Sequence, residues 1–419
     1  MIRALGLVAA VVAVALVVAA CSATEAEDGP VVTVFGPYRG TDAARFAASI
    51  APFEARTGID VRYVGTGSLA ADLVDRIAEG NTPDVAMVPQ PSLVGDLVAM
   101  GQVIPLGPEG VAAVRANYAP SAIDLMTFGE KLHGVLYRAN VKSLVWYPPA
   151  VFEERGYEVP ESWDDLITLT ERMEQDGLQP WCFTLASFAA TGWVGTDWVE
   201  DVMLRLNGPD DYQAWVDGDI SFDDPKVRRS FELFGDIVRT PGRVNGGIRR
   251  ALGVLWNDAA TPMFADPPGC LLHRQASFYR SSLPAGVVLG EDVDVFVLPP
   301  FQTGEAPPLL VGGDLAVGFD DRTDVQAFLA YLATPQSGEA WARAGGYTSP
   351  HTTFDPDLYT DMFDRRIGEM LVSTAAVAFD ASDQMPSAVG TGTFWKGIVY
   401  YVQTGDLDGT VLMIEEGFE

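Results

Sequence analysis

The chain has 419 residues, of which 48% are hydrophobic and 20% are charged, and its 57 acidic and 27 basic side chains give a formal net charge of −30 at pH 7. This length and composition predict a globular protein of two domains, and they exclude a disordered chain and a small disulfide-stapled scaffold. Because such an excess of carboxylates repels phosphate groups and anionic lipid, the composition also argues against a nucleic-acid partner.

The first 20 residues have the pattern of an export signal. Arg3 supplies a positive charge, and the apolar run at 5–18 is too short for a dependable membrane anchor. Cys21 comes directly after two alanines, an arrangement that resembles a bacterial lipobox. The resemblance implies that residues 1–20, the signal peptide, are removed and that Cys21 becomes the lipid-modified first residue. An uncleaved membrane helix and a plain signal with an unrelated cysteine are the alternatives.

A short tether follows the signal. Residues 21–30 are small, polar or acidic, as expected of a flexible segment, and no second long apolar run occurs in the sequence. Two cysteines remain, Cys182 and Cys270. An even pair in an exported protein favours one disulfide, closing a loop of roughly 90 residues. Two buried thiols are the alternative.

From residue 31 onward, short apolar runs alternate with amphipathic stretches. The runs predict buried strands at 31–35, 59–64 and 85–88, and apolar residues at helical spacing predict a helix after each strand. This alternation is typical of a parallel, doubly wound sheet. In such sheets ligands bind beyond the carboxyl ends of the strands. The corresponding loops here are 36–41, 65–68 and 89–92.

The second half of the chain continues the mixed pattern. Ser162 and Asp165 form a capping box at the start of an expected helix. Residues 184–224 are rich in tryptophan, aspartate and glycine, and the helical pattern weakens there. Further on we expect strands at 293–298 and 315–319 and a helix at 325–332.

Signals for cofactors are weak. Gly65, Gly67 and Ala70 have the spacing of a dinucleotide fingerprint, but the acid that should close the following strand instead starts it, as Asp84. The three histidines are far apart and show no metal-ligand spacing. We therefore expect no cofactor and no metal.

A set of phrases, spread in order over most of the chain, carries a family resemblance. They include FEARTGIDVRYV (53–64), NTPDVAMVPQP (81–91), GWVGTDWVEDVMLR (192–205), PPGCLLHRQASF (267–278), LVGGD (310–314), YLATPQSGEAWARAGG (331–346) and FDASDQMP (379–386). Together they resemble the extracellular solute-binding proteins of ABC importers, in particular the carbohydrate-binding branch typified by alpha-glucoside-binding lipoproteins.

The resemblance implies an α/β, two-lobe fold of the periplasmic-binding-protein-like type II, with doubly wound sheets, an interlobe cleft and a hinge. We place lobe one at 31–140 and 308–360, and lobe two at 141–307 and 361–419. A guest bound between the lobes would close them by hinge motion.

A sugar presents hydroxyls in fixed directions and flat apolar faces, so its site combines planar polar groups with aromatic rings. Asp197 lies between Trp193 and Trp198 and supplies both kinds of group within six residues. Asp197 and Trp193 are therefore the strongest candidates for guest contact. Packing in the core of lobe two is the alternative for either tryptophan.

Other candidates are spread over both lobes. Gly313 and Asp314 precede an expected strand, where glycine would admit a close guest and the carboxylate would accept hydroxyl hydrogen bonds; a plain turn is the alternative. The resemblance implies an aromatic wall at Trp395, close to Asp383; packing beneath that wall is the alternative for this tryptophan. Loops at strand ends supply three more candidates, Tyr38, Arg39 and Gln90, and an ordinary solvated charge is the alternative for Arg39. Lower-ranked candidates lie at a strand crossing and beside Cys270, and are Lys142, His273 and Arg274.

The resemblance implies a monomeric, lipid-anchored component on the extracellular face of the membrane. It would capture an alpha-glucoside or small oligosaccharide and deliver it unchanged to the permease subunits of an ABC importer. The alternative is a secreted glycoside-active enzyme, with a pair such as Asp197 and Asp314 acting as acid and base across the cleft.

Overall fold

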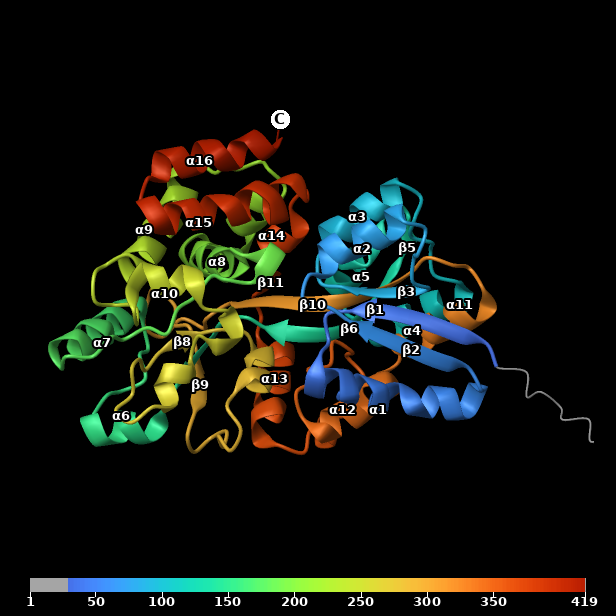
Figure 1. Ribbon diagram of the computed structural model, residues 1–419, viewed down its shortest axis with the longest axis horizontal. Coiled ribbons are helices and arrows are strands. Elements are labelled where there is room, and N and C mark those ends of the chain that lie inside the picture. Colours follow the sequence, from blue (N-terminus) through green and yellow to red (C-terminus); the bar gives the residue numbers. More distant parts are fainter. Residues whose placement is uncertain (1–28, 419) are drawn as a thin grey trace, which may run out of the picture.

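The computed structural model describes residues 29–418, which form two α/β lobes joined through a central sheet (Figure 1). The sheet has the order β11-β10-β3-β1-β2, and β6 pairs with β10. β1 is parallel to β2 and β3, as predicted, whereas β10 is antiparallel to β3 and β6, so the sheet is mixed rather than wholly parallel. Its strands are β1 (Val31–Gly36), β2 (Asp60–Gly65), β3 (Val85–Val88), β6 (Gly134–Val141), β10 (Leu309–Gly318) and β11 (Val377–Phe379).

Lobe one packs helices on both faces of the β1–β3 part of the sheet, with α1 and α12 on one face and α2 and α3 on the other (Figure 1). The predicted inner face of α1 is confirmed, because Phe46, Ile50 and Phe53 are all buried. The elements of this lobe are α1 (Gly40–Thr57), α2 (Leu69–Ala78), α3 (Pro91–Ala99), α4 (Pro108–Asn117), α5 (Pro120–Leu125), β4 (Thr127–Phe128), β5 (Lys131–Leu132), α11 (Thr323–Leu332) and α12 (Glu339–Ala344).

Lobe two is mainly helical and contains a small sheet of order β8-β7-β9. The predicted cap at Ser162 is present, since its side chain accepts a hydrogen bond from Asp165 N at 3.2 Å, but the Asp165 carboxylate accepts from Ser162 Oγ at 2.7 Å and does not complete the box at the Ser162 backbone. Its elements are β7 (Leu144–Tyr147), α6 (Pro149–Arg155), α7 (Trp163–Gln175), α8 (Trp193–Val216, interrupted at Gly208), α9 (Pro225–Val238), α10 (Gly247–Gly253), β8 (His273–Arg274), β9 (Asp294–Val297), α13 (Met362–Ser373), α14 (Ala381–Gln384), α15 (Trp395–Thr404) and α16 (Leu407–Glu415).

Strands β6 and β10 connect the two lobes. The last residues of β10 pair with β3 in lobe one, and its first residues pair with β11 beside lobe two. Each lobe has its own large hydrophobic cluster, and a smaller third cluster lies where the crossing strands leave lobe one. The polar side chains of β6 and β10 therefore lie at the junction of the lobes.

Within residues 29–418 we find no helix of sufficient length and apolar character to span a bilayer. The predicted signal peptide, almost all of the tether and the predicted lipidation residue Cys21 lie outside the described residues.

Candidate binding site

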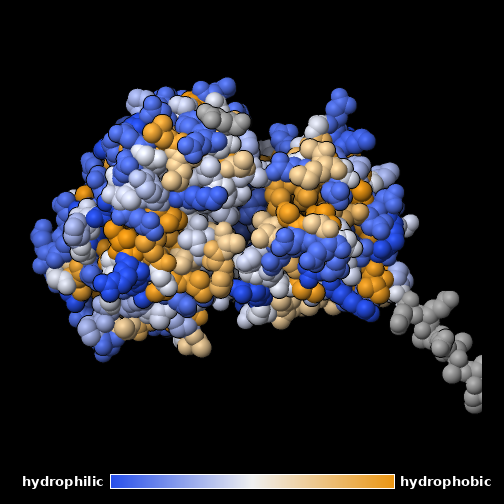
Figure 2. Space-filling view, turned by 45° about the horizontal axis from the view of Figure 1, so that its top comes forward, coloured by the Kyte–Doolittle hydropathy of each residue, from blue (hydrophilic) through white to orange (hydrophobic). Residues whose placement is uncertain are grey.

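The junction of the lobes has a polar floor built on the two crossing strands. Arg138, Asn140 and Lys142 lie at every second position and therefore share one face, and they are only 5%, 7% and 7% exposed. On the neighbouring strand β10, Asp314 pairs with Arg138 and Gly312 pairs with Asn140. Figure 2 shows a furrow between the two halves of the molecule. Of the two cations on this floor, Arg138 lies towards lobe one and Lys142 lies towards lobe two.

Lys142 is the centre of the lobe-two part of this site. Its Nζ lies 3.1 Å from Asp197 Oδ1 and 3.9 Å from Asp383 Oδ2, and it forms a close ion pair with Asp380. Asp197 comes from the first turns of α8, and the other two carboxylates come from the N-terminal end of α14. One ammonium thus joins three carboxylates from two elements that are far apart in the sequence.

Local capping holds the α14 carboxylates in place. Asp380 Oδ1 accepts hydrogen bonds from Asp383 N at 2.8 Å and from Ser382 Oγ at 2.9 Å. Glu200, one turn after Asp197 on α8, accepts a hydrogen bond from Ala381 N at 2.9 Å. The N-terminus of α14 is therefore anchored to α8, which keeps the acidic residues of the two helices together.

Burial and charge act in opposite directions on these carboxyl groups. Burial raises the pKa of Asp197 to about 7, although Lys142 lowers it, and Asp380 adds a further rise. Burial likewise raises the pKa of Asp383, with the Asp380 charge adding to the rise and Lys142 opposing it. For Asp380, burial raises the pKa, but Lys142 and hydrogen bonds outweigh it and the net shift is downward. Asp197 and Asp380 therefore titrate as a pair, in which Asp380 keeps its charge more readily than Asp197.

Arg274 lies behind Asp197, on the core side of the site. Its Nη2 donates to Asp201 Oδ2 at 2.9 Å, and its Nη1 lies 3.4 Å from Asp197 Oδ2. That Asp197 oxygen accepts no hydrogen bond within residues 29–418. Arg274 is almost fully buried, so it supports the predicted contact residue Asp197 from beneath.

The aromatic candidates divide into wall and core. Trp193 is half-buried, and Lys142 Nζ lies 5.7 Å from the centre of its ring. Trp198 is buried in the lobe-two cluster beneath Arg274, so the core alternative applies to it. Trp395 begins α15, and its carbonyl packs against Gly192, where a Cβ would lie 2.4 Å from that oxygen. The indole Nε1 of Trp395 has no hydrogen-bond partner within residues 29–418.

Lobe one contributes a second, smaller polar group. Tyr38 Oη donates to Asp314 Oδ2 at 3.0 Å, and Arg138 Nε lies 3.8 Å from the same oxygen. Gln90 lies next to Asp383 of lobe two, whose pKa its side chain lowers. Arg39 is exposed and packs beside Gly67 rather than in this group. Tyr38, Asp314 and Gln90 are thus buried or half-buried at the junction.

The two glycines before Asp314 have a different setting from the predicted one. Strand β10 already begins at Leu309, so Gly312 and Gly313 lie inside a strand and not in a turn before it. A Cβ at Gly313 would lie 2.6 Å from Leu136 Cδ1 and 2.7 Å from Arg138 O, and one at Gly312 would lie 2.8 Å from Lys142 Cε. The space in front of both glycines is filled by the neighbouring strand.

Comparison with known proteins identifies the family. Residues 39–339 match the family model of the bacterial extracellular solute-binding protein. The chain belongs to this family. It is 41% identical over 391 residues to the osmoprotective compounds-binding protein GgtB of Synechocystis, a match covering 92% of this chain and 91% of that protein. It is 39% identical over 383 residues to the alpha-glucosides-binding periplasmic protein AglE of Rhizobium meliloti, covering 89% and 84%.

Solved structures of low identity show the same fold. The bacterial solute receptor AcbH has a TM-score of 0.77 at 18% identity, covering 93% of this chain and 97% of that chain. Maltose-bound MalE3 of Thermotoga maritima has a TM-score of 0.73 at 15% identity, covering 93% and 99%. The predicted two-lobe α/β fold is confirmed. Because the closely similar relatives are binding proteins, this family member is a binding protein and the alternative of a glycoside-active enzyme is set aside.

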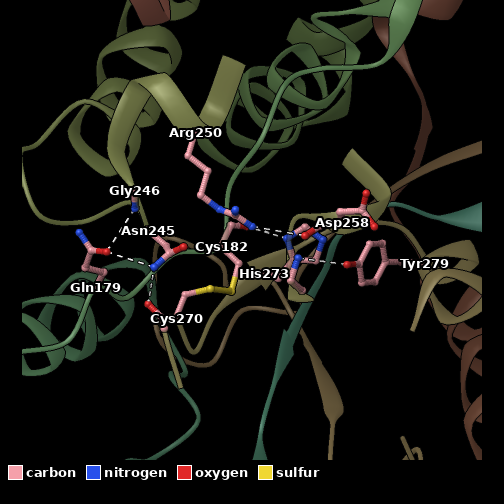
Figure 3. The surroundings of a disulfide bond; sticks show 11 residues. Gln179, Cys182, Asn245, Gly246, Arg250, Asp258, Cys270, His273 and Tyr279 are labelled. Carbon is pink, nitrogen blue, oxygen red and sulfur yellow. Dashed lines mark hydrogen bonds between the residues drawn. A yellow bond between two sulfur atoms is a disulfide. The ribbon is translucent and has the colours of Figure 1, made fainter. Parts of the chain in front are cut away.

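The predicted disulfide is present in this family member. Cys182 and Cys270 are bonded, with their Cα atoms 5.4 Å apart (Figure 3). The Cys182 carbonyl oxygen lies 2.7 Å from His273 Nδ1, and Cys182 N donates to Leu272 O at 2.7 Å. The bond therefore supports strand β8, which carries Arg274, and His273 faces the disulfide loop.

Two floor residues, Arg138 and Asn140, were missing from the sequence-based list. The signal for them was the alternation of polar and apolar residues in Arg-Ala-Asn-Val-Lys at 138–142, which indicates a strand with one polar face. Lys142 was ranked low because nothing near it in the sequence shows its acidic partners.

Carboxylate oxygens of Asp197, Glu200 and Asp380 lie within 4.8 Å of one another, as in a metal site. Lys142 Nζ contacts two of these three groups and supplies the positive charge that a metal would bring. We therefore assign no metal to this cluster.

Proposed function

We propose that this solute-binding protein is the carbohydrate-binding component of an ABC importer, and that it captures an alpha-glucoside or small oligosaccharide between its lobes. The observation that carries the proposal is the polar group around Lys142, whose Nζ lies 3.1 Å from Asp197 Oδ1, 3.9 Å from Asp383 Oδ2 and 5.7 Å from the centre of the half-buried Trp193 ring. Carboxylates close to an aromatic ring match the hydroxyls and the apolar face of a pyranose.

The relatives support the class of guest. The two most extensive matches described above are named for osmoprotective compounds and for alpha-glucosides. In this chain, guest contacts from lobe two are Asp197, Trp193, Asp383 and Trp395, and those from lobe one are Tyr38, Gln90 and Asp314. Arg39, Arg274 and Gly313 act at the edge or beneath these contacts.

Closure of the lobes would complete the site. We assign 31–140 and 308–360 to lobe one and 141–307 and 361–419 to lobe two, and the separate hydrophobic clusters support this division. Contacts across the junction are already present, because Gln90 lies next to Asp383 and Ser92 Oγ lies 3.4 Å from Ser387 Oγ, and bending at β6 and β10 would open and close this region. A guest that contacts both lobes stabilises the closed form by its additional contacts.

Export and anchoring follow from the first 21 residues. We propose that residues 1–20 are a signal peptide and that Cys21 carries a lipid that holds a monomeric protein at the extracellular face, next to the permease subunits. Replacing Cys21 by serine should release the protein from the membrane fraction into the medium. Retention of that variant on the membrane would show that Cys21 is not the anchor.

Calorimetry with trehalose, sucrose, maltose and glucosylglycerol tests the guest class. We expect saturable binding of at least one sugar without formation of product, and a loss of about tenfold or more in affinity for Asp197→Asn. Asp210→Asn is the matched control, because Asp210 is exposed on the same helix. Sustained hydrolysis that Asp197→Asn abolishes would overturn the proposal, and so would absence of binding to all four sugars and to longer glucosides.

A further inference from the structure

Lys142 occupies a special place in the fold. It is the first residue after β6, and its backbone N donates to Leu310 O at 2.8 Å, so both crossing strands hold it. Gly312 on β10 leaves room for the side chain, because a Cβ there would lie 2.8 Å from Lys142 Cε. The ammonium group therefore extends from the hinge strands to the carboxylates of α8 and α14 in lobe two.

Two of the three ammonium protons are donated to carboxylates, and the group is nearly buried. A lysine Nζ carries three protons, and here Nζ faces three carboxylates, donating to Asp197 and Asp380 and lying 3.9 Å from Asp383 Oδ2. Lys142 therefore acts on a guest through the carboxylates that it holds.

The charges around this lysine do not balance without it. The groups that face it are Asp197 and Glu200 from α8, Asp380 and Asp383 from α14, and, behind Asp197, Arg274 from β8. Arg274 is already paired with Asp201 at 2.9 Å. Removing Lys142 would leave several buried carboxylates facing one another, which favours protonation and separation of the pair Asp197 and Asp380.

We propose that Lys142 is a positioning residue of the guest site: it holds Asp197 as a charged acceptor and draws Asp383 of lobe two into the junction opposite Gln90 of lobe one. This inference rests on the proposed function. It makes one side chain, that of Lys142, the connection between the hinge strands and the guest contacts. Guest affinity then depends on the lysine although no guest atom touches it.

The proposal has a pH signature. Burial raises the pKa of Asp197 to about 7 even though Lys142 lowers it. Above this value Asp197 is an ionised acceptor, and below it the carboxyl carries a proton, so affinity for a sugar rises as pH rises through 7. Without Lys142 the pKa of Asp197 increases further, and the same rise in affinity moves to higher pH. A lysine that only packs in place would leave the midpoint unchanged.

The test compares Lys142→Met, Lys142→Arg and the control Lys131→Met, whose lysine is exposed on β5. Calorimetry with trehalose, sucrose, maltose and glucosylglycerol is run from pH 5.5 to 8.5. We expect Lys142→Met to lose at least tenfold in affinity at pH 7 and to shift the pH midpoint of the affinity upward by about one unit or more. Lys142→Arg should recover most of the affinity and reverse most of the midpoint shift, because it keeps the positive charge. Lys131→Met should match the wild type. Wild-type affinity and midpoint in Lys142→Met would overturn the proposal.

A second measurement needs no sugar. With aspartate labelled by ¹³C at the carboxyl carbon, the Asp197 signal is assigned by its loss in Asp197→Asn, and its titration midpoint is expected to rise in Lys142→Met. If no sugar binds the wild type, the guest class is wrong, and an unchanged Asp197 midpoint still overturns the role of Lys142. If Lys142→Met does not fold, the neutral variant Lys142→Gln takes its place with the same expected rise of the Asp197 midpoint, and an unchanged midpoint contradicts the proposal.

Discussion

The phenol of Tyr38 donates a hydrogen bond to Asp314 across 276 positions of sequence, and the two oxygens are 3.0 Å apart. Tyr38 follows the first strand of lobe one, and Asp314 lies in the middle of the strand that returns from lobe two. The bond therefore ties the loop beyond β1 to a strand of the hinge. Both residues are buried, which makes the bond costly to leave unmade.

Tyr38→Phe tests the cost of this bond. Burial raises the pKa of Asp314, and Tyr38 lowers it, so the variant should raise the pKa further. We expect a loss of about 1–2 kcal/mol in the free energy of unfolding, and a smaller loss as the pH falls and Asp314 becomes protonated. Urea unfolding at neutral and at low pH measures this. Tyr400→Phe removes a tyrosine–aspartate bond at the surface and should cost much less stability than Tyr38→Phe. An equal loss in both variants would contradict the prediction.

Replacing Trp193 should mainly weaken sugar binding, whereas replacing Trp198 should mainly lower the stability of the fold. Trp193→Ala is expected to weaken sugar binding by about tenfold with a modest effect on folding, since the ring is only half-buried. Trp198→Ala is expected to cost about 3–5 kcal/mol of unfolding free energy, because it empties a core position. Calorimetry and urea unfolding of both variants check this. Unchanged affinity in Trp193→Ala would remove that ring from the site.

Gly313→Ala should be poorly tolerated. Its new Cβ would lie 2.7 Å from Arg138 O, a backbone atom that moves only with strand β6. We expect a loss of about 1–3 kcal/mol in unfolding free energy. Gly253→Ala is the control, because no atom lies within 4 Å of its Cβ position, and thermal unfolding of the pair gives the comparison. Equal melting temperatures would show that the strands separate easily at this point.

The disulfide should stabilise the wall of lobe two. Cys182 and Cys270 are 88 positions apart, so replacing both by alanine should lower the unfolding free energy by about 4 kcal/mol through the larger entropy of the unfolded chain. Because the bond supports the strand that carries Arg274, we also expect weaker sugar binding. Guanidinium unfolding and calorimetry, with and without reductant, measure both effects. Reductant that leaves affinity and melting temperature of the wild type unchanged would argue against this role.

His351 should make the protein less stable in acid. Burial lowers its pKa from 6.5 to about 3, and its ring nitrogens contact Tyr118 Oη at 2.8 Å and Ser349 Oγ at 3.0 Å. Below pH 6.5 the unfolded chain binds a proton that the folded chain refuses, so the free energy of unfolding falls as pH falls towards 3. His351→Gln should reduce this slope by up to about 1.4 kcal/mol per pH unit. The same slope in both proteins, from urea unfolding between pH 4 and 7, would contradict the assignment.

Much of the fold was predictable because its signals are local. The alternation of strands and helices at 31–101, the buried face of α1 and the cap at Ser162 all depend on residues within a few turns of one another. The start of β10 was not predictable in this way. Gly312 and Gly313 indicate a turn when they are considered alone. They become strand residues only because β10 pairs with β6. Since glycine has no side chain, Lys142 and the Arg138 backbone can lie close to them.

The sequence predicts guest contacts by residue type and not by their connections. It predicts Asp197, Trp193 and Asp383 because carboxylates and rings near one another suit a sugar, and the structure places Asp197 and Asp383 beside the same lysine. The ion pairs of Lys142 span 55 positions to Asp197 and 238 to Asp380, and a charge has no periodicity that reveals its distant partner.

Sequence alone determined the class of the chain: an exported, acidic, two-lobe α/β protein with one pair of cysteines available for a disulfide. Tertiary structure decided which tryptophan is wall and which is core, which arginine lies beneath the site, and that a lysine on the hinge gathers the carboxylates. The physical reason is that burial and electrostatic pairing depend on distances in space, and these exist only once the crossing strands have brought the two lobes together.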